Sequence, residues 1–241
     1  MTLPQETVPV PVNHCQLSRI QFMHHFTDQK FDPFKEQYIE HVFELNKIVR
    51  STGEPLEGNL CYDHLEEKLT AQLSTQYLPK RRTLALMSLM FGNVMEIGFN
   101  AGHSALLMLT ANPSLRLTCV DVCEHKYTVP CYDYLKAIFG DRINLIRSNS
   151  LIAFPLLARQ QKDFDLYIID GGHGVHVAEG DLFNVIQFGK RGSVICFDDS
   201  DFPPLRVMLN MYLITGKLIP LVDQAGYLPN ISQMIFCINK N

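Results

Sequence analysis

Acidic side chains stand at the ends of two apolar runs in the second half of the chain. Asp170 closes the run 165–170, and Asp198 closes the run 193–198 with Asp199 directly after it. If these runs are neighbouring parallel strands, the carboxylates meet at one sheet edge and repel unless a positive charge lies among them. Mg²⁺ prefers carboxylate and water oxygens and leaves positions open for a substrate. The pattern predicts a metal site, with turn capping by these acids as the alternative.

A histidine follows Asp170 by three residues. His173 lies in the loop Gly171-Gly172-His173, which should pass over the same edge of the sheet. Imidazole has an unperturbed pKa of about 6.5, so it can take a hydroxyl proton near neutral pH, more easily where a metal ion polarises that hydroxyl. The spacing therefore predicts His173 as a general base, and a structural hydrogen bond within the loop is the alternative.

A strand–turn–helix pattern lies earlier in the chain. The apolar run 94–97 leads into Gly98 and Gly102, and helix-forming residues follow. Such a turn leaves backbone N–H groups available to a ligand, and glycine lets the backbone approach that ligand closely. A dinucleotide fingerprint would need glycines where Asn100 and His103 stand, so the spacing does not suit a pyrophosphate.

Polar residues also close the two apolar runs that follow this turn. Asp121 ends the run 115–121, where a carboxylate can accept hydrogen bonds from a ribose diol. Ser148 and Ser150 follow the run 143–147, and small polar side chains there could meet an adenine edge. A surface acid at Asp121 and a helix cap at Ser150 are the alternatives.

A sheet must bring these residues together, and the periodicity from residue 93 onward indicates one. Strand-like runs alternate with helical runs, which predicts an α/β fold: a Rossmann-like, mostly parallel, seven-stranded sheet with helices on both faces. The predicted strands are 93–98, 115–121, 143–147, 165–170, 193–198, 217–222 and 232–238. The predicted helices are 103–111, 130–139, 151–160, 176–188 and 203–215.

The first 91 residues lack strand alternation and predict an irregular and helical extension. The expected helices run from Asp32-Pro33 to Gly53, from Asp63 onward, and from Pro79 to Gly92. A boundary near residue 92 would separate this cap or oligomerisation segment (1–91) from the sheet domain (92–241). The apolar faces of the helices suit packing on the sheet or on a second subunit in a homodimer, and the sequence leaves both open.

Composition narrows the class of protein. The 241 residues are 46% hydrophobic with a formal net charge of −4, which allows a large core and shows no basic stripe for nucleic acid. The compact cationic run Lys80-Arg81-Arg82 is expected to be a solvated helix start. No apolar segment approaches a membrane span, and no signal-peptide core is visible. Seven cysteines without a C-x-x-C pair favour free thiols and a cytoplasmic, reducing compartment.

Three motifs together resemble one branch of the class I S-adenosylmethionine-dependent methyltransferases. They are 96–104 (Glu-Ile-Gly-Phe-Asn-Ala-Gly-His-Ser), 169–173 (Ile-Asp-Gly-Gly-His) and 197–199 (Phe-Asp-Asp). That branch contains metal-dependent O-methyltransferases similar to the catechol and macrolide-sugar enzymes. The resemblance covers residues 92–241 and implies methyl transfer from S-adenosylmethionine to a hydroxyl of a small molecule, with Mg²⁺ or another divalent cation.

The resemblance also implies roles for single residues. His173 falls where the catechol enzymes carry a lysine base and the sugar enzymes a histidine, which moves the expected acceptor away from a flat catechol ring. The implied metal ligands are Asp170, Asp198 and Asp199. The implied cofactor-binding residues are Glu96, Gly98, Phe99, Asn100, Gly102, Ser104, Asp121, Ser148, Ser150 and Asp170.

Other classes fit the sequence less well. Gly102-His103-Ser104 is similar to the nucleophile elbow of serine hydrolases, but the final glycine is absent and the last histidine is His176, before further strands. The glycine spacing disfavours a dehydrogenase. A non-catalytic cofactor-binding or interaction module on the same fold is the main alternative, because a fold does not fix a function.

Overall fold

A seven-stranded sheet forms the centre of the protein. The structure is a computed structural model that describes residues 36–58, 60–62, 73–160, 163–172, 174–221 and 233–240. The strand order is β3-β2-β1-β4-β5-β7-β6. The strands are β1 (Asn93–Ile97), β2 (Arg116–Asp121), β3 (Ile143–Arg147), β4 (Leu166–Ile169), β5 (Val194–Phe197), β6 (Leu218–Pro220) and β7 (Met234–Ile238). β1 to β5 pair in parallel, whereas β7 is antiparallel to β5 and β6. The predicted fold class is confirmed.

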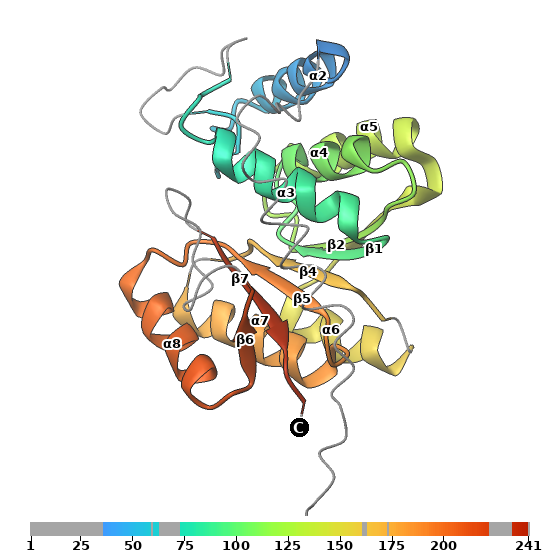
Figure 1. The fold of residues 1–241 in the computed structure, drawn as a ribbon. Coiled ribbons are helices and arrows are strands. Elements are labelled where there is room, and N and C mark those ends of the chain that lie inside the picture. The colour runs from blue at the N-terminus through green and yellow to red at the C-terminus, as the bar shows by residue number, and fades with distance from the viewer. Residues whose placement is uncertain are drawn as a thin grey trace, which may run out of the picture.

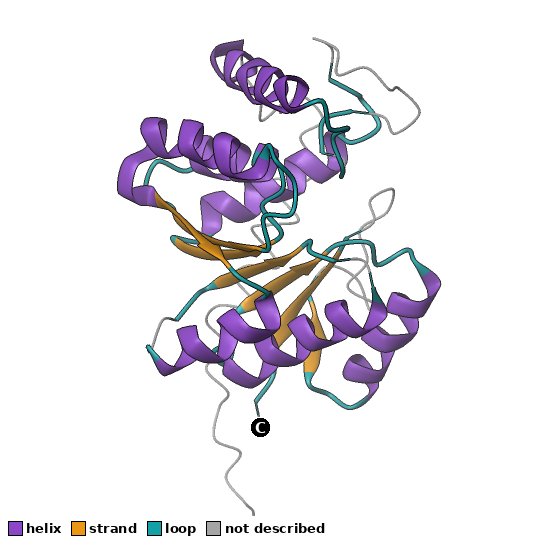
Figure 2. Ribbon diagram, turned by 180° about the vertical axis from the view of Figure 1, so that it is seen from behind, coloured by secondary structure: helices purple, strands orange, loops and turns teal. Residues whose placement is uncertain are grey.

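Helices cover both faces of this sheet (Figures 1 and 2). On one side lie α3 (Leu78–Met90), α4 (His103–Ala111) and α5 (Thr128–Phe139), and α2 (Glu36–Thr52) packs on α4 and α5 from outside. A short 3-10 turn, η1 (Gly140–Arg142), follows α5. The other face carries α6 (Ser150–Arg159), α7 (Val175–Phe188) and α8 (Pro203–Ile214). The five helices predicted beyond residue 93 are all present. The predicted start of the first helix, and residues 63–72 of the helix predicted from Asp63, lie outside the described residues. Leu73, predicted on the same helix, is described and is not helical.

Alternate residues of the central strands enter two separate hydrophobic cores. In β1, Val94 joins the core on the α2–α5 side, and Met95 and Ile97 join the core on the α6–α8 side. Because both faces are covered, the central strands have continuous apolar sequences. Val42 of α2 and Leu84 of α3 belong to the same core as Val94. α2 contacts α4 and α5, and α3 contacts α4, so the helices before residue 92 extend the core on this side by packing on the helices next to the sheet. A domain boundary there stays a prediction.

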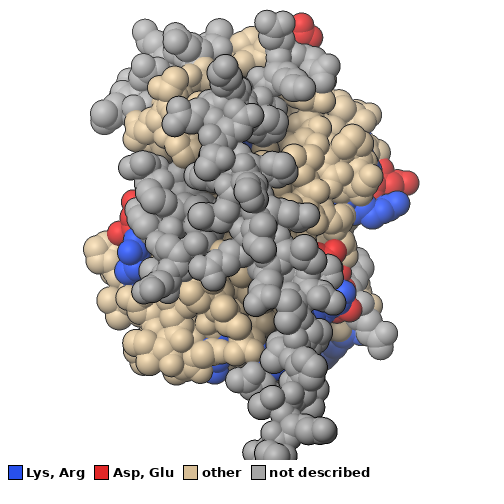
Figure 3. Space-filling view, in the orientation of Figure 1, with Lys and Arg blue, Asp and Glu red and all other residues tan. Residues whose placement is uncertain are grey.

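The surface charges and the cysteines agree only in part with what the sequence predicts. Within the described residues, no helix combines the length and apolar character needed to cross a bilayer. On the described surface visible in Figure 3, acidic and basic side chains lie in small mixed groups. Cys119 and Cys196 are buried free thiols, as expected. Cys237 in β7 is disulfide-bonded, so the expectation of free thiols throughout is wrong at this position.

Candidate functional site

The turn between β1 and α4 depends on its two glycines. Gly98 has φ +93°, and its N–H donates to the Val120 carbonyl at 2.9 Å. A Cβ at Gly98 would lie 1.9 Å from the backbone oxygen of Asp170, so only glycine allows these two segments to approach so closely. Gly102, with φ +77°, precedes α4, which has no side-chain cap. The first N–H groups of α4 have no partner within the helix and can serve a ligand.

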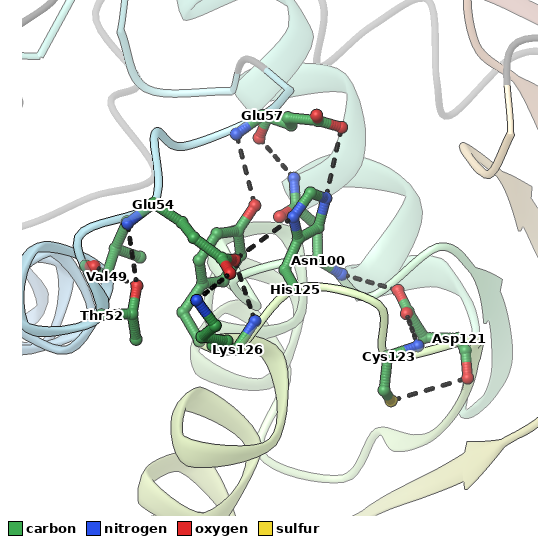
Figure 4. Close-up of polar contacts among 10 residues, drawn as sticks. Val49, Thr52, Glu54, Glu57, Asn100, Asp121, Cys123, His125 and Lys126 are labelled. Carbon is green, nitrogen blue, oxygen red and sulfur yellow. Dashed lines mark hydrogen bonds and ion pairs between the residues drawn. The ribbon is translucent and has the colours of Figure 1, made fainter.

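Asp121, at the end of β2, binds this same turn. Its Oδ2 accepts the N–H of Phe99 at 2.8 Å. Oδ2 also accepts the N–H of Asn100 at 2.9 Å, and Oδ1 accepts the N–H of Cys123 at 2.6 Å (Figure 4). A carboxylate oxygen has two acceptor positions, so Oδ1 keeps one after the bond from Cys123. Asp121 therefore fixes the turn and still offers an acceptor toward a ligand.

Glu96 lies beneath the turn, fully buried in β1. The hydroxyl of Ser104 donates to its Oε1, and the thiol of Cys119 lies 3.3 Å from its Oε2. Burial raises the pKa of Glu96 to about 8, against the opposing effect of these hydrogen bonds. Ser104 lines the central cavity, whereas Glu96 is not among its described lining residues. Glu96 thus positions Ser104, and its direct contact with a cofactor stays a prediction.

Ser148 and Ser150 lie beyond the end of β3 and line the same cavity as Asp121. The N–H of Ser148 donates to the Asp121 carbonyl at 2.9 Å. The cap of α6 is Asn149, whose side chain accepts the N–H of Leu151 at 2.9 Å. Asn149 therefore caps the helix in place of Ser150, which is the first residue of α6.

The acids that end β4 and β5 meet around a lysine of α3. Lys80 Nζ donates to Asp198 Oδ2 and lies 3.8 Å from Asp170 Oδ2. The side chains of Lys80 and Asp198 are only 10% and 3% exposed. Arg81 beside it is also buried, and its Nη1 donates to the Leu60 carbonyl at 3.0 Å. The expectation of a solvated helix start is therefore wrong for both residues.

Charge within this group is tightly coupled. Burial alone would lower the pKa of Lys80, but the charges of Asp170 and Asp198 outweigh it and raise that pKa, with a contribution from Asp199. Burial and the charge of Asp170 raise the pKa of Asp198 above its usual range, and Lys80 opposes that shift. No group of three His, Cys, Asp or Glu side chains able to hold a metal ion occurs within the described part of the chain. His173 lies outside it.

A buried polar cluster at the start of α4 was not predicted. His103 Nε2 lies 3.0 Å from Asn46 Oδ1, and Asn46 Nδ2 donates to the Tyr62 hydroxyl. Because the Asn46 carbonyl can only accept, Nε2 of His103 carries the proton. Burial lowers the pKa of His103 to about 4, so the imidazole is neutral near pH 7. The partners come from α2 and the segment after it, which no local motif around residue 103 indicates.

Residues 54–58 cross over the loop that follows β2 (Figure 4). The N–H of Glu57 donates to the Tyr127 hydroxyl at 3.3 Å, and Asn100 Nδ2 donates to the Glu57 carbonyl. Glu57 Oε2 lies 3.2 Å from His125 Nε2, and the His125 ring stacks on Tyr127 with centroids 4.8 Å apart. Hydrogen bonds from residues 54–58 therefore connect the segment after α2 to the glycine turn and to the loop after β2.

One cavity of about 430 Å³ joins these features. Its described lining includes the glycine turn, Asp121, the serines after β3, and both Lys80 and Asp170. Apolar side chains from the residues before β1 and from α7 complete it: Leu56, Leu60, Leu84 and Val177. The cavity thus brings polar and apolar lining residues together in one continuous space.

Comparisons with known proteins agree with this architecture. Residues 95–200 match a family described as methyltransferase domain. No curated protein matches the sequence. Similar solved structures include the SAH-bound methyltransferase PaMTH1 from Podospora anserina, 12% identical with TM-score 0.62 over 97% of this chain and 99% of that one. The O-methyltransferase from Bacillus cereus in complex with SAH is 14% identical, with TM-score 0.61 over 92% and 97%. TomG from Streptomyces achromogenes, an O-methyltransferase of tomaymycin synthesis in complex with SAM, is 15% identical, with TM-score 0.60 over 95% and 99%.

Proposed function

We propose that this protein transfers a methyl group from S-adenosylmethionine to a hydroxyl oxygen of a small molecule, and the match of residues 95–200 to a methyltransferase domain supports this. The observation that carries the proposal is that one continuous cavity of about 430 Å³ is lined by the glycine turn and also by Lys80 and Asp170. A donor and an acceptor held in one space can react without a diffusive encounter.

The polar lining of the cavity fits a nucleoside cofactor. Asp121 offers an acceptor position suited to a ribose hydroxyl, and the N–H groups at the start of α4 are available above the turn. Asn100 Oδ1 is buried and has no hydrogen-bond partner among the described residues. A buried acceptor of this kind needs a donor, and an ammonium or hydroxyl of a bound cofactor would supply it. These features support S-adenosylmethionine as the ligand.

The same cavity can hold the acceptor. Leu56, Leu60 and Leu84 line it with apolar side chains, and Lys80 and Asp170 line it with charged ones. An acceptor with an apolar body and one hydroxyl directed to the charged side chains suits this lining. These apolar side chains come from the residues before β1, so the segment that the sequence left unassigned shapes the space for the acceptor. A homodimer through the same helices stays a prediction.

S-adenosylmethionine would supply a methyl group already activated on a sulfonium. The residues of this chain must hold the acceptor oxygen in line with that methyl group, exclude water, and receive the hydroxyl proton. His173 is the predicted base for this proton. The predicted Mg²⁺ ligands Asp170 and Asp198 are engaged by Lys80 instead. As arranged, these oxygens do not fit a divalent cation.

Calorimetric titration with S-adenosylhomocysteine tests the cofactor site. We expect saturable binding to the wild-type protein and a roughly 10- to 100-fold weaker affinity for Asp121→Ala, because a hydrogen bond to a charged acceptor contributes about 1.5–3 kcal/mol. Asp133→Ala, at an exposed aspartate of α5, is the matched control and should bind like the wild type.

Two results would count against the proposal. If the wild-type protein does not bind S-adenosylhomocysteine at millimolar ligand, the proposed cofactor is wrong. If the wild type and Asp121→Ala bind it with equal affinity, the proposed ribose contact at the end of β2 is wrong. Binding without turnover of any hydroxyl compound would instead favour the non-catalytic module.

A further inference from the structure

A lysine stands where a metal ion was predicted. Lys80 reaches from α3 to the ends of β4 and β5, where its Nζ donates to Asp198 Oδ2 and lies 3.8 Å from Asp170 Oδ2. The group is largely removed from water, with side-chain exposures of 10% for Lys80 and 3% for Asp198. Asp170, at 30%, is the more open member, and both Lys80 and Asp170 line the cavity.

Lys80 and a divalent cation would compete for the same oxygens. Mg²⁺ requires near-octahedral coordination at about 2.1 Å from its oxygen ligands. Asp198 Oδ2 already accepts from Lys80 Nζ, so an ion there would be forced against a buried ammonium. Like charges at such separations repel strongly in a weakly screened site. The carboxylates, in turn, have in the ammonium the positive partner that buried acids need.

We propose that the Lys80 ammonium takes the place of the divalent cation in this protein, so that the site binds its acceptor hydroxyl without a metal ion. This inference rests on the proposed methyl transfer. An ammonium has three N–H donors; Asp198 Oδ2 accepts from one, and Asp170 Oδ2 at 3.8 Å contributes its charge. Lys80 lines the cavity, so a remaining N–H can hold the acceptor oxygen there and stabilise negative charge that develops on it.

The transfer balances without a metal ion. The acceptor oxygen forms a bond to the methyl carbon, the carbon–sulfur bond breaks, and its electron pair remains on sulfur. The hydroxyl proton passes to the base predicted at His173. Lys80 keeps its protons throughout and contributes only charge and hydrogen bonding.

Mn²⁺ binding, measured by calorimetry with MnCl₂ as the probe, tests directly whether the Lys80 ammonium occupies the place of a divalent cation. The wild-type protein should show no saturable Mn²⁺ binding at millimolar concentrations. Lys80→Met removes the ammonium at similar length, exposes two carboxylates to the ion, and should bind Mn²⁺ at least roughly ten-fold more tightly than the wild type. Adding Asp198→Asn to Lys80→Met should abolish that gain. Lys190→Met, which breaks the exposed pair with Asp163 (3.3 Å), is the matched control and should leave Mn²⁺ binding unchanged.

Two outcomes overturn the inference. One is saturable Mn²⁺ binding by the wild type that Asp198→Asn removes. The other is a folded Lys80→Met protein that binds Mn²⁺ no better than the wild type. If Lys80→Met does not fold, melting of the wild type with MnCl₂ or with EDTA decides, since a stabilisation by Mn²⁺ that Asp198→Asn removes refutes the proposal. S-adenosylhomocysteine binding, measured on the same samples, separates failure of this inference from failure of the proposed function.

Discussion

The buried carboxyl of Glu96 makes a sharp prediction about stability and pH. Its pKa in the folded protein is raised to about 8 by burial, from an ordinary value of 4.5. The fold therefore favours the protonated form, and the unfolded chain favours the ionised form above pH 4.5. The stabilisation is complete below that pH and is lost as pH rises through 8. The difference of 3.5 pKa units corresponds to about 5 kcal/mol of unfolding free energy.

Glu96→Gln should remove this dependence, because glutamine keeps the shape and the acceptor for the Ser104 hydroxyl but carries no titratable proton. We expect the variant to gain about 5 kcal/mol relative to the wild type between about pH 4.5 and pH 8. Urea unfolding of both proteins across this range gives the difference at each pH. Glu179→Gln, at an exposed position of α7, is the control and should follow the wild-type curve.

Parallel stability curves for the wild type and Glu96→Gln would refute the reasoning. They would mean that Glu96 is ionised in the fold at neutral pH, with solvent or a positive group reaching it. The Ser104 hydroxyl would then donate to a charged carboxylate and not to a neutral carboxyl group.

Two further predictions concern the same turn. Gly98→Ala should destabilise the protein by about 3 kcal/mol or more in urea unfolding, because its Cβ would lie 1.9 Å from a backbone oxygen. The control Gly53→Ala has a similar positive φ with nothing within 4 Å and should cost only about 1 kcal/mol. Equal costs for the two variants would contradict the close approach at Gly98. His103, with its pKa lowered to about 4, should contribute about 3 kcal/mol that is present above about pH 6.5 and lost as pH falls through 4. His103→Gln should remove this loss of stability at acid pH, as measured by urea unfolding across the pH range. An unchanged loss in the variant would mean that the imidazole is not buried as described.

The sheet could be predicted from sequence because each strand carries its own signal. Apolar runs bounded by glycine or by acids mark the parallel strands, and the resemblance to class I methyltransferases is confirmed at the level of domain and fold. Residues at strand ends share one edge, so Asp121, Asp170 and Asp198 could be assigned to a common site without knowing any long-range contact. Their individual hydrogen bonds could not be assigned, because the backbone of the turn decides that Asp121 binds Phe99 and Asn100.

Lys80 and His103 escaped prediction for a different reason. A charged run at a helix start most often faces solvent, and only contacts across 118 residues bury Lys80 beside Asp198. His103 likewise depends on Asn46, 57 residues earlier in the chain. Local sequence shows the chemistry of a side chain but not its burial, and burial gives both residues their unusual pKa values.

The carboxylates at the sheet edge and the cation that neutralises them come from different parts of the chain. Asp170 and Asp198 are fixed by β4 and β5, which the fold itself requires, whereas Lys80 is delivered by α3, which lies before the first strand. The acids alone create a requirement for positive charge, and that requirement can be met by an ion from solution or by a side chain. A lysine delivered by a helix is present in every molecule and is independent of metal supply. It cannot, however, adjust its coordination to the acceptor as an ion can. The choice of acceptor would then depend on the walls contributed by Leu56, Leu60 and Leu84, in the same part of the chain that supplies Lys80.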